Sequence, residues 1–427
     1  MNALLTTLFK VARWVLGAVF VFSAVVKLID PLGTAYKFQD YFDVLNITSL
    51  SAYALFFSVA WSVVELLIGI NLLTGIRLKA TLIVAALFMA VVTPLTAWIA
   101  IANPVSDCGC FGDALVIGNW TTFYKNIALS LLLVLLFFLY RHHAPRLDPK
   151  TELILMAYTL LSALIFAHLN YYYLPMIDFR PYRIGTYLPD KMVIPHGASS
   201  NEYSTTFILE KNGVRKTFSL SNYPDSTWTF VAQRSVLVKK GFTPAIQNFA
   251  LHDEQMNDLT DSLLHVKHYL FLVIADHLND METNHLNALK SLQAYAQGYQ
   301  YGFYLLTGSA EEDASAFLKK VEWQVPVLYA DPITLKTMIR SNPGLMLLYN
   351  GTVINKWSNA ELPMFRKSLN QNILLEMPSI PRYWEAIGFM LMYILLFWVI
   401  RFRLSNKKKK SNTSINRFYH TTNYSIK

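Results

Sequence analysis

Six apolar stretches of about 20 residues constrain this chain more than any other feature. A helix that spans the hydrocarbon core of a membrane needs about 20 predominantly apolar residues. The stretches lie roughly at 11–29, 51–73, 80–101, 122–140, 152–174 and 383–400. Short loops separate the first five, and a long segment of ordinary soluble composition precedes the sixth. The sequence therefore predicts an α-helical membrane bundle that carries one large soluble segment.

The composition agrees with a membrane protein and excludes a purely soluble one. Charged residues make up 15% of the chain, against about 25% in soluble domains. The net charge of +9 comes almost entirely from residues 401–427, which hold eight basic and no acidic side chains. The other 400 residues carry 29 basic and 28 acidic side chains. We therefore expect no nucleic-acid partner, and we expect the basic tail to contact anionic membrane lipid.

Charges in the loops predict the orientation of the bundle. Basic residues flank one set of span ends, at Lys10, Arg13, Arg77, Lys79, Arg141, Arg146 and Lys150. Acidic residues dominate the opposite loops, at Asp30, Asp40, Asp43, Asp107 and Asp113. Because cytoplasmic loops are rich in Lys and Arg, we expect a multi-pass protein of the bacterial inner membrane with both termini cytoplasmic. Residues 175–382 and the loop with Asp107 would then be periplasmic. The first span is too long for an ordinary signal peptide.

The soluble segment divides into two parts. Residues 180–240 contain short alternating runs, Ser204–Leu209 and Arg215–Leu220, separated by Asn212-Gly213. This dipeptide is typical of a β-hairpin turn, so we expect a β-rich connector. From Gly241 the pattern alternates between strands and amphipathic helices, as in an α/β sandwich with a mixed sheet. Strands are expected at Tyr269–Ile274, Phe303–Leu306, Pro326–Tyr329, Leu345–Tyr349 and Thr352–Trp357, and helices near 282–297, 310–320, 332–340 and 359–370.

The second part resembles the thioredoxin fold in its TlpA/redoxin-like branch. The entry segment 241–251 and Pro343, placed before the final hairpin where that family has a cis-proline, carry the resemblance. The turn at 275–280, where the family places Cys-x-x-Cys, has no cysteine. A thiolate is the reacting species in disulfide exchange, so this domain is predicted to be inactive by itself. The resemblance implies a partner-binding face at Asn342, Pro343 and His277; a catalytic His277 is the weaker alternative to an inert loop histidine.

Several motifs in the first four spans form a second pattern. They are Arg13-Trp14-Val15-Leu16-Gly17, Phe22-Ser23, Lys27-Leu28-Ile29-Asp30-Pro31, Glu65 with Gly69, Asp107-Cys108-Gly109-Cys110-Phe111-Gly112-Asp113, Asn119-Trp120 and Lys125-Asn126. In these motifs the chain resembles the DoxX-like superfamily, and within it the methylamine-utilisation MauE branch. The resemblance covers about residues 5–142, and its most specific element is the Cys-Gly-Cys-Phe-Gly run.

Cys108 and Cys110 are the only two cysteines of the chain. A disulfide across one glycine closes a very small ring near the limit of disulfide geometry, and such a bond is more oxidising than a structural one. One hypothesis is a redox pair that exchanges with a partner thiol. The alternatives are a static disulfide that pins the loop, and half of a metal site, which two ligands support poorly. We expect neither a metal nor a cofactor.

Glu65 lies deep in the second span, where a carboxylate is costly and a functional candidate by default. Lys27 and Asn71 are the candidate partners. The alternative is a buried structural pair that fixes how the helices pack, and DoxX-like bundles contain such a glutamate without a known catalytic role.

The predicted organisation has six parts. They are the DoxX/MauE-like four-helix unit at 1–142, the fifth span and its exit at 143–179, the β-rich connector at 180–240, the degenerate thioredoxin-like domain at 241–372, the sixth span at 383–402 and the basic tail at 403–427. The MauE resemblance implies an accessory protein of envelope thiol–disulfide chemistry or protein maturation, whose partner is a periplasmic thiol protein or client. Two alternatives stay open: a non-catalytic membrane scaffold with a structural Cys108–Cys110 disulfide, and a DoxX-type subunit of a quinone-linked oxidoreductase.

Overall fold

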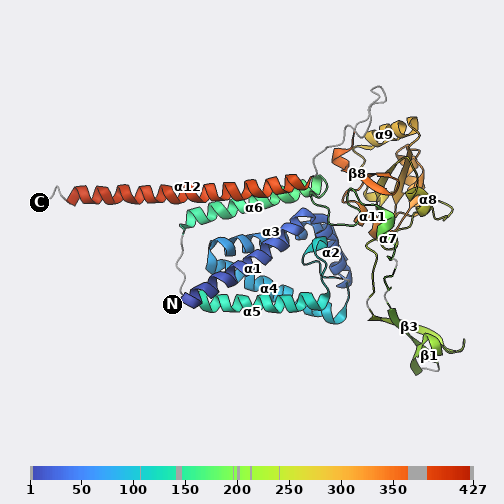
Figure 1. The fold of residues 1–427 in the computed structure, drawn as a ribbon, viewed down its shortest axis with the longest axis horizontal. Coiled ribbons are helices and arrows are strands. Elements are labelled where there is room, and N and C mark those ends of the chain that lie inside the picture. The colour runs from blue at the N-terminus through green and yellow to red at the C-terminus, as the bar shows by residue number, and fades with distance from the viewer. Residues whose placement is uncertain are drawn as a thin grey trace.

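The computed structural model describes residues 3–105, 107–140, 147–195, 197–199, 202–211, 214–239, 241–363 and 382–423. It consists of a helical bundle, a mixed five-stranded sheet with its helices at one end of that bundle, and a small three-stranded sheet (Figure 1). The amino-terminal end of α1 and the carboxy-terminal end of α12 both point away from the five-stranded sheet (Figure 1).

The six predicted spans are confirmed as helices within the described residues. Each helix is long and apolar enough to cross a membrane. They are α1 (Ala3–Ile29), α3 (Ala54–Thr74), α4 (Leu78–Ala102), α5 (Asn119–Tyr140), α6 (Pro149–Tyr172) and α12 (Tyr383–Asn423). In α12 the apolar part is Tyr383–Leu404. The chain is therefore a multi-pass membrane protein.

Small residues bring α1 and α3 into close contact. A Cβ atom on Gly69 would lie 2.8 Å from the backbone nitrogen of Val21, and one on Gly17 would lie 3.1 Å from the carbonyl oxygen of Gly69. Such close approach of helix backbones is how membrane helices gain packing contacts without a hydrophobic driving force. The last span joins through α6, because Tyr158 and Tyr393 stack with ring centroids 5.3 Å apart.

The segment between the first two spans is a helix, not the loop that the sequence indicated. α2 covers Pro31–Val44, and the 3-10 helix η1 covers Thr48–Tyr53. Asp30 caps α2 by accepting a hydrogen bond from the backbone nitrogen of Gly33, and Pro31 occupies the first helical position, where proline is favoured. Its charged residues interrupt the hydropathy signal, so an apolar window does not reveal this helix.

The connector contains an antiparallel sheet with the strand order β2-β1-β3. Its strands are β1 (Glu202–Lys211), β2 (Val214–Ser219) and β3 (Thr229–Lys239). The predicted pairing of the first two strands is confirmed, with Leu209 opposite Lys216. The predicted turn Asn212-Gly213 lies outside the described residues.

The C-terminal domain contains the mixed sheet β6-β5-β4-β7-β8, in which β4, β5 and β6 are parallel and β7 and β8 antiparallel. The five predicted strands are confirmed, with ends that differ by one residue. They are β4 (Tyr269–Ala275), β5 (Gly302–Thr307), β6 (Val327–Tyr329), β7 (Gly344–Tyr349) and β8 (Thr352–Ser358). The helices are α8 (Thr260–Leu264), α9 (Leu286–Gly298), α10 (Glu311–Lys320) and α11 (Pro332–Met338). The predicted helix near 359–370 begins as the 3-10 helix η5 (Asn359–Glu361), and residues 364–381 lie outside the described part.

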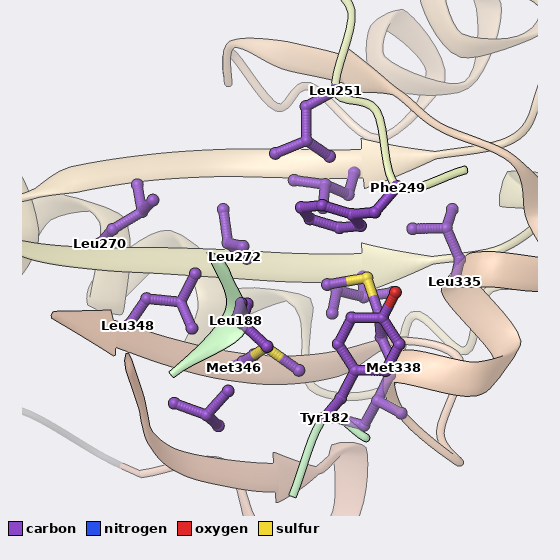
Figure 2. Close-up of a cluster of buried hydrophobic side chains, with 14 of the residues drawn as sticks. Tyr182, Leu188, Phe249, Leu251, Leu270, Leu272, Leu335, Met338, Met346 and Leu348 are labelled. Carbon is purple, nitrogen blue, oxygen red and sulfur yellow. The ribbon is translucent and has the colours of Figure 1, made fainter. Parts of the chain in front are cut away.

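The chain segment that leaves α6 belongs to the core of this domain. Tyr182 and Leu188, from the short helix α7 (Leu188–Met192) and the turn before it, pack against Phe249 and Leu272 (Figure 2). Lys356 on β8 is buried and lies 2.8 Å from Asp178. The exit from the fifth span and the start of the predicted connector are thus folded into the C-terminal domain. This domain is anchored directly to the bundle.

Candidate redox site

Cys108 and Cys110 lie in the loop between α4 and α5. Both are free and half-buried, and their Sγ atoms are 2.8 Å apart. Gly109 between them has φ +63°, a conformation that other residues rarely adopt. A Cβ atom at this position would also lie 3.1 Å from the Lys37 side chain. The glycine therefore allows the turn that brings the two thiols together beneath α2.

Hydrogen bonds from α1 and α2 hold the backbone of this loop. The Tyr41 hydroxyl donates to the carbonyl oxygen of Cys108 at 2.8 Å, and the Ser23 hydroxyl donates to that of Cys110 at 2.7 Å. Lys37 pairs with Asp107 at 3.0 Å, and the other carboxylate oxygen of Asp107 accepts from the backbone nitrogen of Gly109 at 2.9 Å. The helix α2, which the hydropathy pattern did not predict, thus helps to position the cysteine loop.

The two thiols have opposite acid–base behaviour. The hydrogen bond between the two thiols lowers the pKa of Cys108 to about 6, and it outweighs burial, which raises that pKa. The Lys125 ammonium group adds to the lowering. The pKa of Cys110 is raised well above its ordinary value, because its proton is held by Cys108 and because it is buried. The site therefore holds one nucleophilic thiolate beside one thiol that can donate a proton.

Glu65 forms a buried ion pair with Lys27, one of the two candidate partners that the sequence offered. The Lys27 Nζ lies 2.8 and 2.9 Å from the two carboxylate oxygens, and the two residues are 6% and 4% exposed. Lys27 also donates to the Ser23 hydroxyl at 3.1 Å. Because Ser23 bonds to the Cys110 carbonyl, the buried pair is connected to the cysteine loop through one side chain.

Arg340, just after α11, joins the C-terminal domain to the same loop. Its guanidinium Nε lies 3.0 Å from both carboxylate oxygens of Asp30, and one terminal nitrogen lies 3.1 Å from Asp113, three residues after Cys110. The guanidinium also lies over the Tyr36 ring, 5.3 Å from its centroid. Arg340 is 6% exposed. One buried arginine thus bonds to the cap of α2 and to the cysteine loop.

The structure brings together the residues predicted for the face of the C-terminal domain. The Asn342 side-chain nitrogen donates to the backbone oxygen of His277 at 3.0 Å, and the Asn342–Pro343 peptide bond is cis. The His277 ring is half exposed and lies 3.1 Å from the Asp276 carboxylate. This face begins two residues after Arg340, on the side of the domain that meets the bundle.

Sequence reasoning missed Tyr41, Asp113 and Arg340 as parts of the site. Tyr41 lies in an acidic segment and Asp113 lies at the end of the Cys-Gly-Cys motif, so their sequence positions offered a signal. No sequence signal distinguishes Arg340 from the other arginines. Within the described residues, no three His, Cys, Asp or Glu side chains gather as metal ligands would.

Comparison with known families supports the assignment of the bundle. Residues 5–139 match the family model described as methylamine utilisation protein MauE. The N-terminal membrane region is therefore similar to MauE. The match spans α1 to α5 with the cysteine loop and covers about a third of the chain. Residues 203–240 match a domain of unknown function, DUF8463, which corresponds to the three-stranded sheet. No curated protein and no solved structure matches the chain.

Proposed function

We propose that this protein is a MauE-like membrane accessory protein of envelope thiol–disulfide chemistry, with Cys108 and Cys110 as its redox pair. The observation that carries the proposal is the pair of thiols 2.8 Å apart, one with a lowered and one with a raised pKa. A static loop does not require two neighbouring thiols with different pKa values. Thiol exchange, by contrast, needs a nucleophile and a proton donor side by side.

The exchange has two steps. The Cys108 thiolate attacks one sulfur of a partner disulfide; a mixed disulfide forms, and the other partner sulfur leaves and takes the proton of Cys110. The Cys110 thiolate then attacks Cys108 in the mixed disulfide, which forms the Cys108–Cys110 bond and releases the second partner thiolate, to be protonated from water. Two electrons pass to the partner disulfide. In the reverse direction, the oxidised pair takes two electrons from a partner dithiol.

The C-terminal domain is the proposed partner-binding module. Its strand order and the position of Pro343 just before β7 support a thioredoxin-like fold. The turn at 275–280 after β4 has no cysteine, so the domain would bind without reacting. Arg340 supports this role, because it joins the domain to the loop that carries the reactive thiols.

The proposed orientation places the cysteine loop and the C-terminal domain in the periplasm. Both lie at one end of the bundle, as the contact between Arg340 and Asp113 requires (Figure 1). The loop charges favour the same side for both segments. Disulfides persist in the periplasm and not in the cytosol, so this orientation suits thiol–disulfide exchange.

Trapping the mixed disulfide tests the function. Cys110→Ser removes the thiol that resolves the intermediate, so cells with this variant should accumulate a covalent adduct at Cys108, identified by mass spectrometry and released by a reductant. Cys108→Ser and the double variant are the matched controls and should accumulate none. If Cys110→Ser yields no adduct and the double variant behaves as wild type, the scaffold hypothesis replaces the redox one.

A further inference from the structure

The cationic side chains around the cysteine loop differ in what they pair with. Most are engaged by carboxylates: Lys27 with Glu65, Lys37 with Asp107 and Asp40, and Arg340 with Asp30 and Asp113. The Tyr41 phenol of α2 also faces the thiols, and burial raises its pKa, so it stays neutral. Lys125 of α5 is different, because no carboxylate in the described part of the chain lies within ion-pair distance of its ammonium group.

An aromatic ring of the cysteine loop holds the Lys125 ammonium group. Its Nζ lies over the Phe111 ring, 4.2 Å from the centroid, and the face of an aromatic ring attracts a cation. Phe111 directly follows Cys110 and is buried, and its ring packs edge-on against Phe22 of α1 with centroids 5.3 Å apart. A half-buried positive charge without a carboxylate partner is thus fixed beside the thiol pair.

Thr122 lies three residues before Lys125 and therefore on the same face of α5. Its side chain is fully buried, and its hydroxyl oxygen has no hydrogen-bond partner of ordinary geometry among the described residues. Cys108 is the group that this hydroxyl reaches, since donation from Thr122 is one of the causes that lower the Cys108 pKa. A neutral thiol is a weak acceptor, whereas an ionised acceptor forms a strong hydrogen bond. The hydroxyl therefore gains its partner when Cys108 is a thiolate.

Two side-chain amides fix the rotation of this end of α5. The Asn119 nitrogen donates to the Val105 carbonyl at 3.2 Å, in the chain segment that follows α4. The Asn126 nitrogen donates to the buried Thr96 hydroxyl of α4 at 3.1 Å. These bonds keep the face with the threonine and the lysine turned toward the cysteine loop.

We infer that Lys125 is the counter-charge of the thiolates formed during exchange and that Thr122 is the hydrogen-bond donor to the Cys108 thiolate. The inference rests on the proposed function and assigns two further residues to it. In the first step the nucleophile at Cys108 carries the negative charge. When Cys110 gives up its proton, the charge passes to the sulfur next to Phe111, which is beside the same ammonium group. The charge of Lys125 accordingly lowers the pKa of both thiols.

The acidity of Cys108 in the reduced full-length protein, held in lipid nanodiscs, tests the role of Lys125. Lys125→Met removes the charge and keeps the length of the side chain, so the pH midpoint of Cys108 alkylation by iodoacetamide should rise by about half to one pH unit. From a wild-type pKa of about 6, the thiolate fraction at about pH 5.5 then falls about three- to eightfold. The alkylation rate, read by peptide mapping, should fall by the same factor. Lys125→Arg keeps the charge and should keep the wild-type midpoint.

Matched variants separate charge from packing. Lys79→Met removes an exposed lysine at the opposite end of α4 and should leave the midpoint unchanged. Thr122→Val removes the hydroxyl at nearly constant shape and should also raise the midpoint, and Thr122→Ser should restore it. An unchanged midpoint in Lys125→Met, or an equal rise in Lys125→Arg, overturns the role of Lys125, and an unchanged midpoint in Thr122→Val overturns that of Thr122. If Lys125→Met does not fold, Lys125→Gln gives the same comparison.

The alkylation assay needs no partner protein, so its outcome is independent of the trapping experiment. If Cys110→Ser traps an adduct in cells but the alkylation midpoints do not move, the exchange stands and the assignment of Lys125 and Thr122 is wrong. If the midpoints move as expected but no adduct is trapped, the proposed exchange fails, and the two residues still stabilise the Cys108 thiolate.

Discussion

Removal of the Arg340 guanidinium should release the C-terminal domain from the cysteine loop. Its partners differ in burial: the Asp30 side chain is 13% exposed, and that of Asp113 is 40% exposed. Burial raises the pKa of Asp30, but the charges of Arg340 and Arg180 and the hydrogen bonds to the carboxylate outweigh it, so the pKa is lowered overall. Asp30 therefore depends on its counterion to stay charged in the docked state.

The size of the shift in the docking equilibrium follows from the charge of Asp30, which the substitution leaves unpaired. Removal of one partner of a buried ion pair costs about 3–5 kcal/mol, and the exposed pairing with Asp113 adds little. Because the C-terminal domain has its own core, the cost should appear as undocking, with no loss of that core. At about 1.4 kcal/mol for each factor of ten, Arg340→Met should shift the docking equilibrium by about a hundredfold or more.

Hydrogen–deuterium exchange read by mass spectrometry measures this shift. In Arg340→Met, amides at the start of α2 and in the cysteine loop should exchange faster, while those of β4 and β7 keep their protection. Arg215→Gln, which breaks an exposed pair with Glu210, is the control and should change nothing in these segments. Adding Asp30→Asn to Arg340→Met should restore part of the protection. Unchanged hydrogen exchange in Arg340→Met would refute the docking role of Arg340. Losses of protection that simply add in the double variant would refute its pairing with Asp30.

Two further predictions concern the thiols and the buried pair. Because the pKa of Cys108 is lowered to about 6, its alkylation by iodoacetamide should rise with pH to half its maximum near pH 6 and level off above pH 7, as peptide mapping would show. Cys110→Ala removes the hydrogen-bond donor and should move that midpoint up toward the ordinary thiol value of about 8.5; a wild-type midpoint near 8.5 argues against the assignment. Lys27→Met leaves Glu65 buried without a counterion and should cost about 3–5 kcal/mol of stability, measured by thermal unfolding in detergent, and Glu65→Gln in the same chain should recover most of it. Glu65→Gln can also be combined with Cys110→Ser. If Glu65→Gln folds normally but the combined variant yields no adduct, the Lys27–Glu65 pair serves thiol exchange as well as helix packing.

Some elements could be predicted from the sequence because their signals are local. A span is a property of about 20 consecutive residues, and a strand such as Tyr269–Ala275 is an apolar run bounded by polar turns. The Cys-Gly-Cys loop is visible as a motif, and the scarcity of charges inside spans makes Lys27 one of two candidate partners of Glu65. These features need no knowledge of which distant segments meet.

Other elements were hidden because their signals are not local. α2 is held by a proline, a capping aspartate and contacts to the bundle, and its charged residues lie outside any apolar period. Tyr182 and Leu188 belong to a segment with no strong pattern of its own, but both become buried because they pack against the sheet of the C-terminal domain.

The sequence by itself determined the six spans, the strands of the C-terminal domain and the one place where thiol chemistry can occur. Only the tertiary structure decided what surrounds that place. Arg340 and Asp30 are 310 residues apart in the chain, and nothing in the sequence pairs them until folding brings them together. Burial makes the pairing strong, because a charge removed from water must find a partner.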